Sequence, residues 1–320
     1  MPAEILTRME KALENESQSR HPVHQVGAYM RGQDTAKSNF EIGRPNFWPP
    51  ALAEKFAPDE KLGNASTTVH AEIAVLLNAP GTEGAELYVT DLPCPNCAKA
   101  IAEARIGSVY IDSHAHVTPL GKKMEPYFRS ISLPLLQYAG VNLLEVNREN
   151  RTVEPLTNIP EGKVIPVERP VEMSLLGKGD VTPESFAKMI ERARTKIGTD
   201  QPFVACYAHS RLGTYTALLV RPHIAIGLDE ERIESLKPLL EKYSLTLQPT
   251  NRALITASRY GLKIDQDYFY SAHVPTSREF VNLIGAGHTK IAIGDRTKSR
   301  DEWGLKALAQ LEEKNILQAN

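Results

Sequence analysis

The sequence predicts an α/β fold that occurs in two tandem copies, each with a mixed sheet covered by helices. Residues 69–112 alternate helix-like apolar periodicity with short apolar runs that are typical of buried strands. The same order of helices and strands returns after residue 182, and shifting the chain by 182 positions aligns residues 70–112 with residues 252–294 without a gap. Identical residues meet at Ala71, Tyr88, Pro93 and Ile111. We interpret this recurrence as an internal duplication, the alternative being a chance match of two ordinary α/β segments.

The first copy, residues 1–152, begins with an amphipathic helix and two strands, followed by a loop rich in proline and aromatic residues. A second helix then leads into alternating strands and helices. The expected helices are residues 3–14, 69–79, 94–106 and 125–139, and the expected strands are residues 23–30, 37–42, 85–91, 108–112 and 141–146.

Residues 153–181 are predicted to be a linker, because five prolines between Val153 and Pro183 leave no room for a helical period. The second copy is then residues 182–320. Its first expected elements are a helix at 182–197, strands at 203–209 and 213–220, and a helix at 229–243.

Composition narrows the class of protein. The 320 residues carry a formal net charge of −2, so nothing in the overall charge favours nucleic acid or an anionic membrane as the main partner. Three cysteines are too few for a disulfide framework and suit a reducing compartment. The absence of a long apolar run or a signal-peptide pattern completes the expectation of a cytoplasmic protein without a membrane segment.

One group of residues in the first copy is a candidate catalytic metal site. His70 and Glu72 open the second helix, and Cys94 and Cys97 open the next one in a Pro-Cys-Pro-Asn-Cys run. One imidazole and two thiolates form a zinc ligand set with a fourth position open, which is typical of a catalytic site. Each ligand lies at the start of a core-facing helical stripe, so packing the two helices side by side brings them together, and helix N-termini favour thiolates.

Glu72 makes this group a candidate active site. Its carboxylate lies two positions after His70 and can reach a water in the open position without binding the metal. Zinc lowers the pKa of such a water toward neutrality, and a carboxylate can then carry its proton to a substrate. The alternatives are a structural zinc site and a chance set of residues. A closed structural site would need a fourth ligand near by, and Cys206 in the second copy is the only other cysteine.

The pattern His-x-Glu followed by Pro-Cys-x-x-Cys resembles the cytidine deaminase-like superfamily, and LPCPNCAKAIAEARIGSVYID looks most like its deoxycytidylate deaminase branch. The resemblance implies a three-layer αβα fold, Zn²⁺ held by His70, Cys94 and Cys97, and a proton shuttle at Glu72. It implies hydrolytic removal of an exocyclic amine from a cytosine ring or the equivalent carbon of a purine, and an oligomeric, often dimeric, protein. The family's substrate asparagine has no clear match between Arg44 and Thr68. The candidate substrate-binding residues are Asn46, Ala71 and Pro93.

The second copy lacks this chemistry. The 182-residue offset places Arg252, Leu254, Thr276 and Glu279 where the first copy has His70, Glu72, Cys94 and Cys97. The second copy is therefore predicted to be a degenerate deaminase-like domain that does not bind zinc. It can serve packing, which we favour, or close the active site, or bind a regulator.

Three functions remain open at this point. The favoured one is an enzyme acting on a free pyrimidine nucleotide, nucleoside or base. The second is a purine or tRNA adenosine-type deaminase, and the third is a non-catalytic nucleotide-binding or assembly protein. Cys206 is expected to be a small buried hydrophobe, His114 and His116 a solvated loop pair, and Gly285 and Gly287 a helix C-terminus.

Overall fold

The computed structural model describes residues 2–159, 170–236 and 243–320. In its first half, the predicted alternation of helices and strands is present. The helices are α1 (Pro2–Glu16), α2 (Pro50–Ala53), α3 (Ala71–Asn78), α4 (Pro95–Glu103), α5 (Pro119–Tyr127) and α6 (Leu133–Tyr138), with a 3-10 turn at Ser113–Val117 and a π-helical turn at Phe128–Ser132. The strands are β1 (Gly27–Gln33), β2 (Asn39–Pro45), β3 (Lys61–Leu62), β4 (Ala65–Ser66), β5 (Glu86–Val89), β6 (Ser108–Asp112), β7 (Asn142–Asn147) and β8 (Thr152–Pro155).

The second half repeats this alternation. Its helices are α7 (Pro183–Ile197), α8 (Glu230–Leu236), α9 (Pro249–Arg259), α10 (Ser277–Gly285) and α11 (Glu302–Glu313), with a 3-10 turn at Lys178–Asp180. Its strands are β9 (Glu172–Leu176), β10 (Val204–His209), β11 (Tyr215–Val220), β12 (His223–Ile224), β13 (Thr246–Leu247), β14 (Lys263–Val274), β15 (Lys290–Ser299) and β16 (Gln318–Ala319). The first half of the helix expected at 229–243 is α8, and residues 237–242 of it fall outside the described residues.

The two six-stranded sheets share the topology of five strands, and this confirms the predicted duplication. The sixth strand differs, because β8 lies beside β7 in the first sheet and β9 lies beside β11 at the opposite edge of the second. The strand orders of the two sheets are β2-β1-β5-β6-β7-β8 and β16-β15-β14-β10-β11-β9. In the first sheet, β1 pairs antiparallel with both β2 and β5, and β5, β6 and β7 run parallel. In the second sheet, β10 pairs antiparallel with both β11 and β14, and β14, β15 and β16 run parallel. We call the parts built on these sheets the first unit and the second unit.

The boundaries differ from the expected ones in places where local patterns compete. The first strand begins at Gly27 rather than residue 23, and the helix expected at 125–139 begins at Pro119 and is completed by α6. The segment predicted as a linker also contributes an edge strand to each sheet, because β8 pairs with β7 and β9 pairs with β11. Prolines exclude a helix there but are tolerated in strands at the edge of a sheet.

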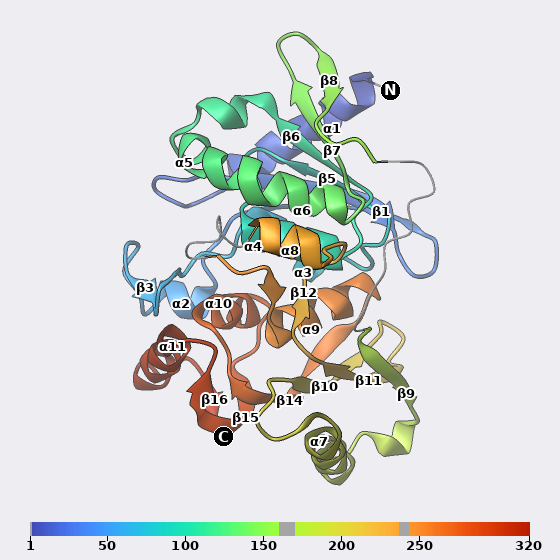
Figure 1. The fold of residues 1–320 in the computed structure, drawn as a ribbon, viewed down its shortest axis with the longest axis vertical. Helices are drawn as coiled ribbons and strands as arrows, with labels where there is room; N and C mark the ends of the chain where they lie inside the picture. Colours follow the sequence, from blue (N-terminus) through green and yellow to red (C-terminus); the bar gives the residue numbers. More distant parts are fainter. Residues whose placement is uncertain (1, 160–169, 237–242) are drawn as a thin grey trace.

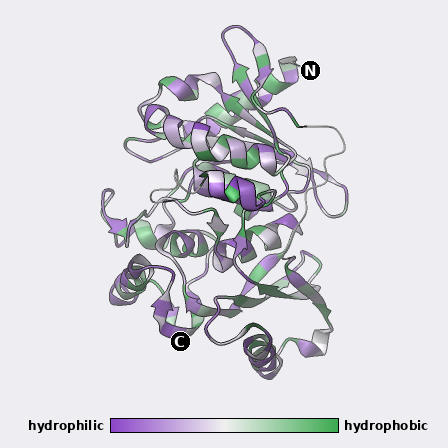
Figure 2. Ribbon diagram, in the orientation of Figure 1, coloured by the Kyte–Doolittle hydropathy of each residue, from purple (hydrophilic) through white to green (hydrophobic). Residues whose placement is uncertain are grey.

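Both units are three-layered, and they meet through their inner helices. In the first unit, α1 covers one face of the sheet and α3, α4 and α6 cover the other; in the second unit, α7 lies opposite α9, α10 and α11. Figure 1 shows α1 and α7 toward opposite ends of the molecule, with α3, α4 and α9 between the sheets. The inner helices of both units share one continuous hydrophobic core. Hydrophobic residues concentrate on the strands, whereas the outer helices mix both kinds (Figure 2).

Two smaller expectations, for Cys206 and for the end of α10, are confirmed. Cys206 is fully buried in β10, and burial raises the pKa of its thiol. Gly285 ends α10, and Gly287 has a φ of +90°, which suits the residue after a helix. None of the described helices combines the length and apolar character needed to cross a membrane.

Candidate active site

Three donor side chains meet where α3 and α4 begin. His70 and Cys94 are the residues that immediately precede α3 and α4, and Cys97 lies in the first turn of α4. The Nδ1 atom of His70 lies 3.3 Å from Cys97 Sγ and 3.6 Å from Cys94 Sγ. All three donor atoms lie within 4.8 Å of one another, and no other group of this kind is found in the described part of the chain. The structure thus brings together the three residues that the sequence predicts as ligands.

The two thiols interact directly. A hydrogen bond with Cys97 holds the pKa of the Cys94 thiol well below its ordinary value, and both sulfurs are buried. A buried thiolate beside an imidazole and a second thiol is a donor set that fits Zn²⁺.

Glu72 lies beside this group without joining it. The side chain occupies the first turn of α3 and is 4% exposed, and burial raises the pKa of its carboxyl to about 7. Glu72, His70 and Cys94 line a cavity of about 160 Å³. A molecule in this cavity therefore meets a carboxyl group together with two of the three metal-binding side chains.

The candidate substrate-binding residues differ in their placement. Ala71 and Asn46 line the cavity, whereas Pro93 is buried next to Cys94 and does not. Asn46 also serves the fold: its Oδ1 accepts hydrogen bonds from Ser19 Oγ at 2.6 Å and from the Val26 N–H at 3.0 Å. Its Nδ2 donates one hydrogen bond to the His24 carbonyl at 2.8 Å, which leaves one N–H of the amide available to a ligand.

The cavity has further walls that sequence reasoning does not single out. His21, His24 and Asp91 line it, together with Leu120 and Met124. Burial raises the pKa of Asp91 to about 6. These residues come from separate segments and do not recur at a spacing typical of metal ligands. Only Asp91, which shortly precedes Cys94, has a position in the sequence that points to the cavity. The loop histidine His116 lies elsewhere, with Nδ1 2.7 Å from Glu125 and Nε2 2.8 Å from Glu145, while His114 is exposed.

Comparison with known proteins identifies the family to which the chain belongs. A family model described as the cytidine and deoxycytidylate deaminase zinc-binding region matches residues 3–113. An uncharacterized deaminase from the luxG 3′ region of Aliivibrio fischeri is 30% identical over 130 residues, which are 40% of this chain and 82% of that protein. The chain belongs to the cytidine and deoxycytidylate deaminase family. Zn²⁺ is the cofactor supported by both the zinc-binding family region and the His70, Cys94 and Cys97 group.

Other relatives of this deaminase have different named substrates. The deoxycytidylate deaminase of enterobacteria phage T4 is 33% identical over 104 residues, covering 31% of this chain and 52% of the phage protein. The tRNA-specific adenosine deaminase of Agrobacterium fabrum is 42% identical over 78 residues, covering 22% of this chain and 49% of that protein.

In the second unit of the deaminase, a hydrogen-bonded carboxylate occupies the place of the metal-binding group. Thr276 caps α10 as Cys94 caps α4, and Glu279 occupies the position of Cys97. One carboxylate oxygen of Glu279 accepts from the Thr250 N–H at 2.8 Å, and the other accepts from the Thr276 N–H at 2.8 Å. Glu279 therefore joins the N-termini of α9 and α10, as the donor group of the first unit joins those of α3 and α4.

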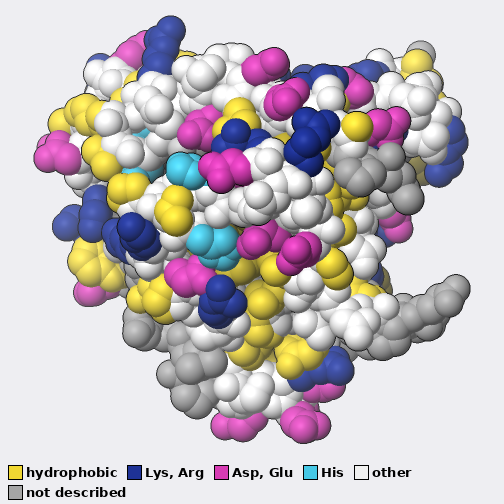
Figure 3. Space-filling view, turned by 90° about the horizontal axis from the view of Figure 1, so that it is seen from above, with side chains coloured by type: hydrophobic (Ala, Val, Ile, Leu, Met, Phe, Trp, Pro, Cys, Tyr) yellow, Lys and Arg dark blue, Asp and Glu magenta, His cyan; other side chains and the backbone are white. Residues whose placement is uncertain are grey.

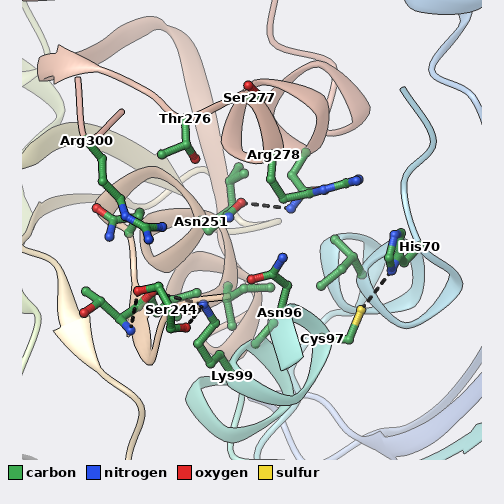
Figure 4. Close-up of a pocket in the computed structure, with 18 of the residues that line it drawn as sticks. His70, Asn96, Cys97, Lys99, Ser244, Asn251, Thr276, Ser277, Arg278 and Arg300 are labelled. Carbon is green, nitrogen blue, oxygen red and sulfur yellow. Dashed lines mark hydrogen bonds between the residues drawn. The ribbon is translucent and has the colours of Figure 1, made fainter. Parts of the chain in front are cut away.

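The second unit also contacts a residue that lines the active-site cavity. A second cavity of about 120 Å³ lies between the units and is lined by His70 and Cys97 on one side and by Arg278 and Arg300 on the other (Figure 4). Arg278 donates a hydrogen bond of 2.8 Å to the carbonyl of Thr68, a residue that lines the active-site cavity. The backbone just before His70 is thus held by the second unit.

Across the same boundary, Lys99 of α4 is tied to the second unit. Its Nζ donates to the carbonyl of Ser244 at 2.6 Å and to that of Thr246 at 3.1 Å. The side chain is buried, and burial lowers the pKa of Lys99 to about 8. Hydrogen bonds from buried charged groups are among the stronger ones, so Lys99 contributes to the packing of the two units.

Proposed function

We propose that this deaminase removes the exocyclic amine of a free cytosine nucleotide, nucleoside or base by hydrolysis. The observation that carries the proposal is that Glu72 lines one cavity together with His70 and Cys94, two members of the His70, Cys94 and Cys97 group. A Zn²⁺ ion held by that group would supply Lewis-acid chemistry that makes water a nucleophile near neutral pH.

Glu72 would carry the proton in this reaction. Its carboxylate accepts a proton from the attacking water and donates it to the ring nitrogen next to the carbon that bears the amine. A second transfer through the same carboxylate protonates the leaving amine, so that water and the amine become the ring carbonyl and ammonia. The buried position of Glu72 keeps its carboxyl close to this chemistry and away from bulk water.

A free substrate agrees better with the charge of the protein than a polynucleotide does. The net charge is −2, and the face in Figure 3 intersperses Lys and Arg with Asp and Glu rather than gathering one sign. The match to a tRNA-specific adenosine deaminase supports a tRNA adenosine-type activity as the second candidate. A non-catalytic nucleotide-binding protein is the third, and the intact Glu72 argues against it. We also propose a cytoplasmic homo-oligomer, such as a dimer.

Ammonia release tests these candidates. The zinc-loaded protein is assayed with dCMP, cytidine, cytosine, adenine and guanine compounds, and tRNA. We expect release from a free cytosine compound, and release at least about a hundredfold slower from the Glu72→Ala variant prepared in parallel. Release from tRNA alone would favour the second candidate, and no release from any compound would contradict enzymatic function.

A further inference from the structure

The second unit keeps a cavity in the place that corresponds to the active-site cavity. The 182-residue offset carries the wall residues Asp91, Leu92 and Cys94 onto His273, Val274 and Thr276. These three residues line a cavity of about 370 Å³ in the second unit. Gln248 and Thr250, at the start of α9, line the same cavity. We call this space the second-unit cavity.

The side chains that replace the metal-binding group do not fill this space. Arg252, at the position of His70, turns to Glu103 of the first unit, with 2.9 Å between Nε and Oε1. The Glu279 carboxylate is occupied by backbone N–H groups of α9 and by Thr276. A unit kept only for packing gains stability by filling such a void, because dense interiors are more stable than hollow ones.

Some polar groups of the residues that line the second-unit cavity have no hydrogen-bond partner among residues 2–159, 170–236 and 243–320. The Oγ1 atom of Thr250 and the Nε2 atom of His273 are buried without a hydrogen bond in the described structure. Arg300 lines this cavity and the inter-unit cavity (Figure 4), is exposed, and makes no hydrogen bond or ion pair with the described part of the chain, so its guanidinium is open to a ligand. Buried polar atoms without partners destabilise a fold, so a ligand that supplies them would stabilise it.

We propose that the second-unit cavity binds a nucleoside 5′-phosphate. The phosphate pairs with the guanidinium of Arg300, whose planar N–H groups match phosphate oxygens. The hydroxyl of Thr250 and the ring nitrogen of His273 bond to the polar edge of the base, and Val274 and Pro275 offer apolar contact to its ring. The base class rests on the proposed function, because it is taken from the correspondence with the active-site cavity.

Calorimetric titration with dCMP tests the proposal in the zinc-loaded full chain, with Glu72→Gln present to stop turnover. We expect two molecules of dCMP per chain. Arg300→Gln should weaken one of the two sites by about tenfold or more, through loss of a charge-assisted pair. Arg211→Gln, which removes an exposed arginine in the turn between β10 and β11, should leave both sites intact.

Thr250→Val provides a second variant that preserves shape. Because the Thr250 hydroxyl has no partner among the described residues, its removal should not lower the melting temperature, yet it should weaken the site that Arg300→Gln weakens. Arg300→Lys should restore part of that affinity.

Each outcome of the titration is decisive. One site that is insensitive to both Arg300→Gln and Thr250→Val would overturn the proposal and leave the proposed function standing. One site that depends on Arg300 would support the proposal and contradict dCMP as the ligand of the active-site cavity. Inorganic phosphate that binds the Arg300-dependent site as tightly as dCMP would show a free-phosphate site and overturn the nucleotide assignment. No binding of dCMP would overturn the proposal for the second-unit cavity and would leave cytidine or cytosine as the substrate of the active-site cavity.

Discussion

Arg252 and Glu103 form a buried ion pair across the two units. The Arg252 Nε lies 2.9 Å from Glu103 Oε1, and the two side chains are 1% and 8% exposed. Arg252 also donates to the carbonyl of Arg221 within its own unit. The position that holds a metal-binding histidine in the first unit thus holds an interface residue in the second, which supports packing as one role of the degenerate copy.

We expect Arg252→Met to destabilise the protein by about 3–5 kcal/mol, because it leaves the Glu103 carboxylate buried without its partner. Urea denaturation measures the change. The double variant Arg252→Met with Glu103→Leu should recover most of the loss, since the uncompensated charge is gone. A single variant as stable as the wild type would show that the pair does not hold the units together.

Glu72→Ala should lower kcat by about 10²- to 10⁴-fold while the protein keeps its fold and its zinc, because only the proton carrier is removed. Turnover of the substrate found in the ammonia screen and metal content are measured on the same preparation. A variant that keeps most of its rate would contradict the proton-carrier assignment.

Cys97→Ala should lose zinc, and its melting temperature should fall, because metal binding and folding are linked. Elemental analysis and thermal unfolding with and without a chelator are the measurements. The chelator should lower the melting temperature of the wild type and leave that of Cys97→Ala unchanged. Cys206→Ala, a buried cysteine of the second unit, is the matched control and should keep the metal. Wild-type zinc content in Cys97→Ala would refute the ligand assignment.

Stability should fall in mildly acid solution because of His288. This side chain is 3% exposed, and burial lowers its pKa from 6.5 to about 4, opposed in part by the charge of Asp265. Between these two pH values the unfolded chain binds a proton that the folded chain does not, so folded-state stability declines as pH drops through this window.

For a shift of this size, the contribution lost between pH 7 and pH 5 is about 2 kcal/mol. Urea denaturation at both pH values compares the wild type with His288→Gln, which has no titrating ring. The wild type should lose more stability than the variant by that amount. Equal losses in the two proteins would mean that His288 does not stay neutral in the fold.

The sequence by itself predicts the two-copy α/β order and the group formed by His70, Glu72, Cys94 and Cys97. Both are local properties of the sequence. The spacing of apolar residues identifies each helix and strand, and the donor residues lie at the starts of two helices that pack on the same sheet. The exact same spacing also shows that the second unit lacks the group. Edge strands such as β8 and β9 are harder to predict from the sequence. Prolines in this region exclude a helix, but they do not exclude a strand at the edge of a sheet.

Only the tertiary structure decides which side chains complete the cavities and join the units. His21, Asn46 and Asp91 come from separate segments and meet only when the sheet forms. Arg252 finds Glu103, and Arg278 finds the Thr68 carbonyl, over separations of more than a hundred residues. Periodicity determines which face of a helix is buried, but the partner across a packed interface depends on how two folded units fit against each other.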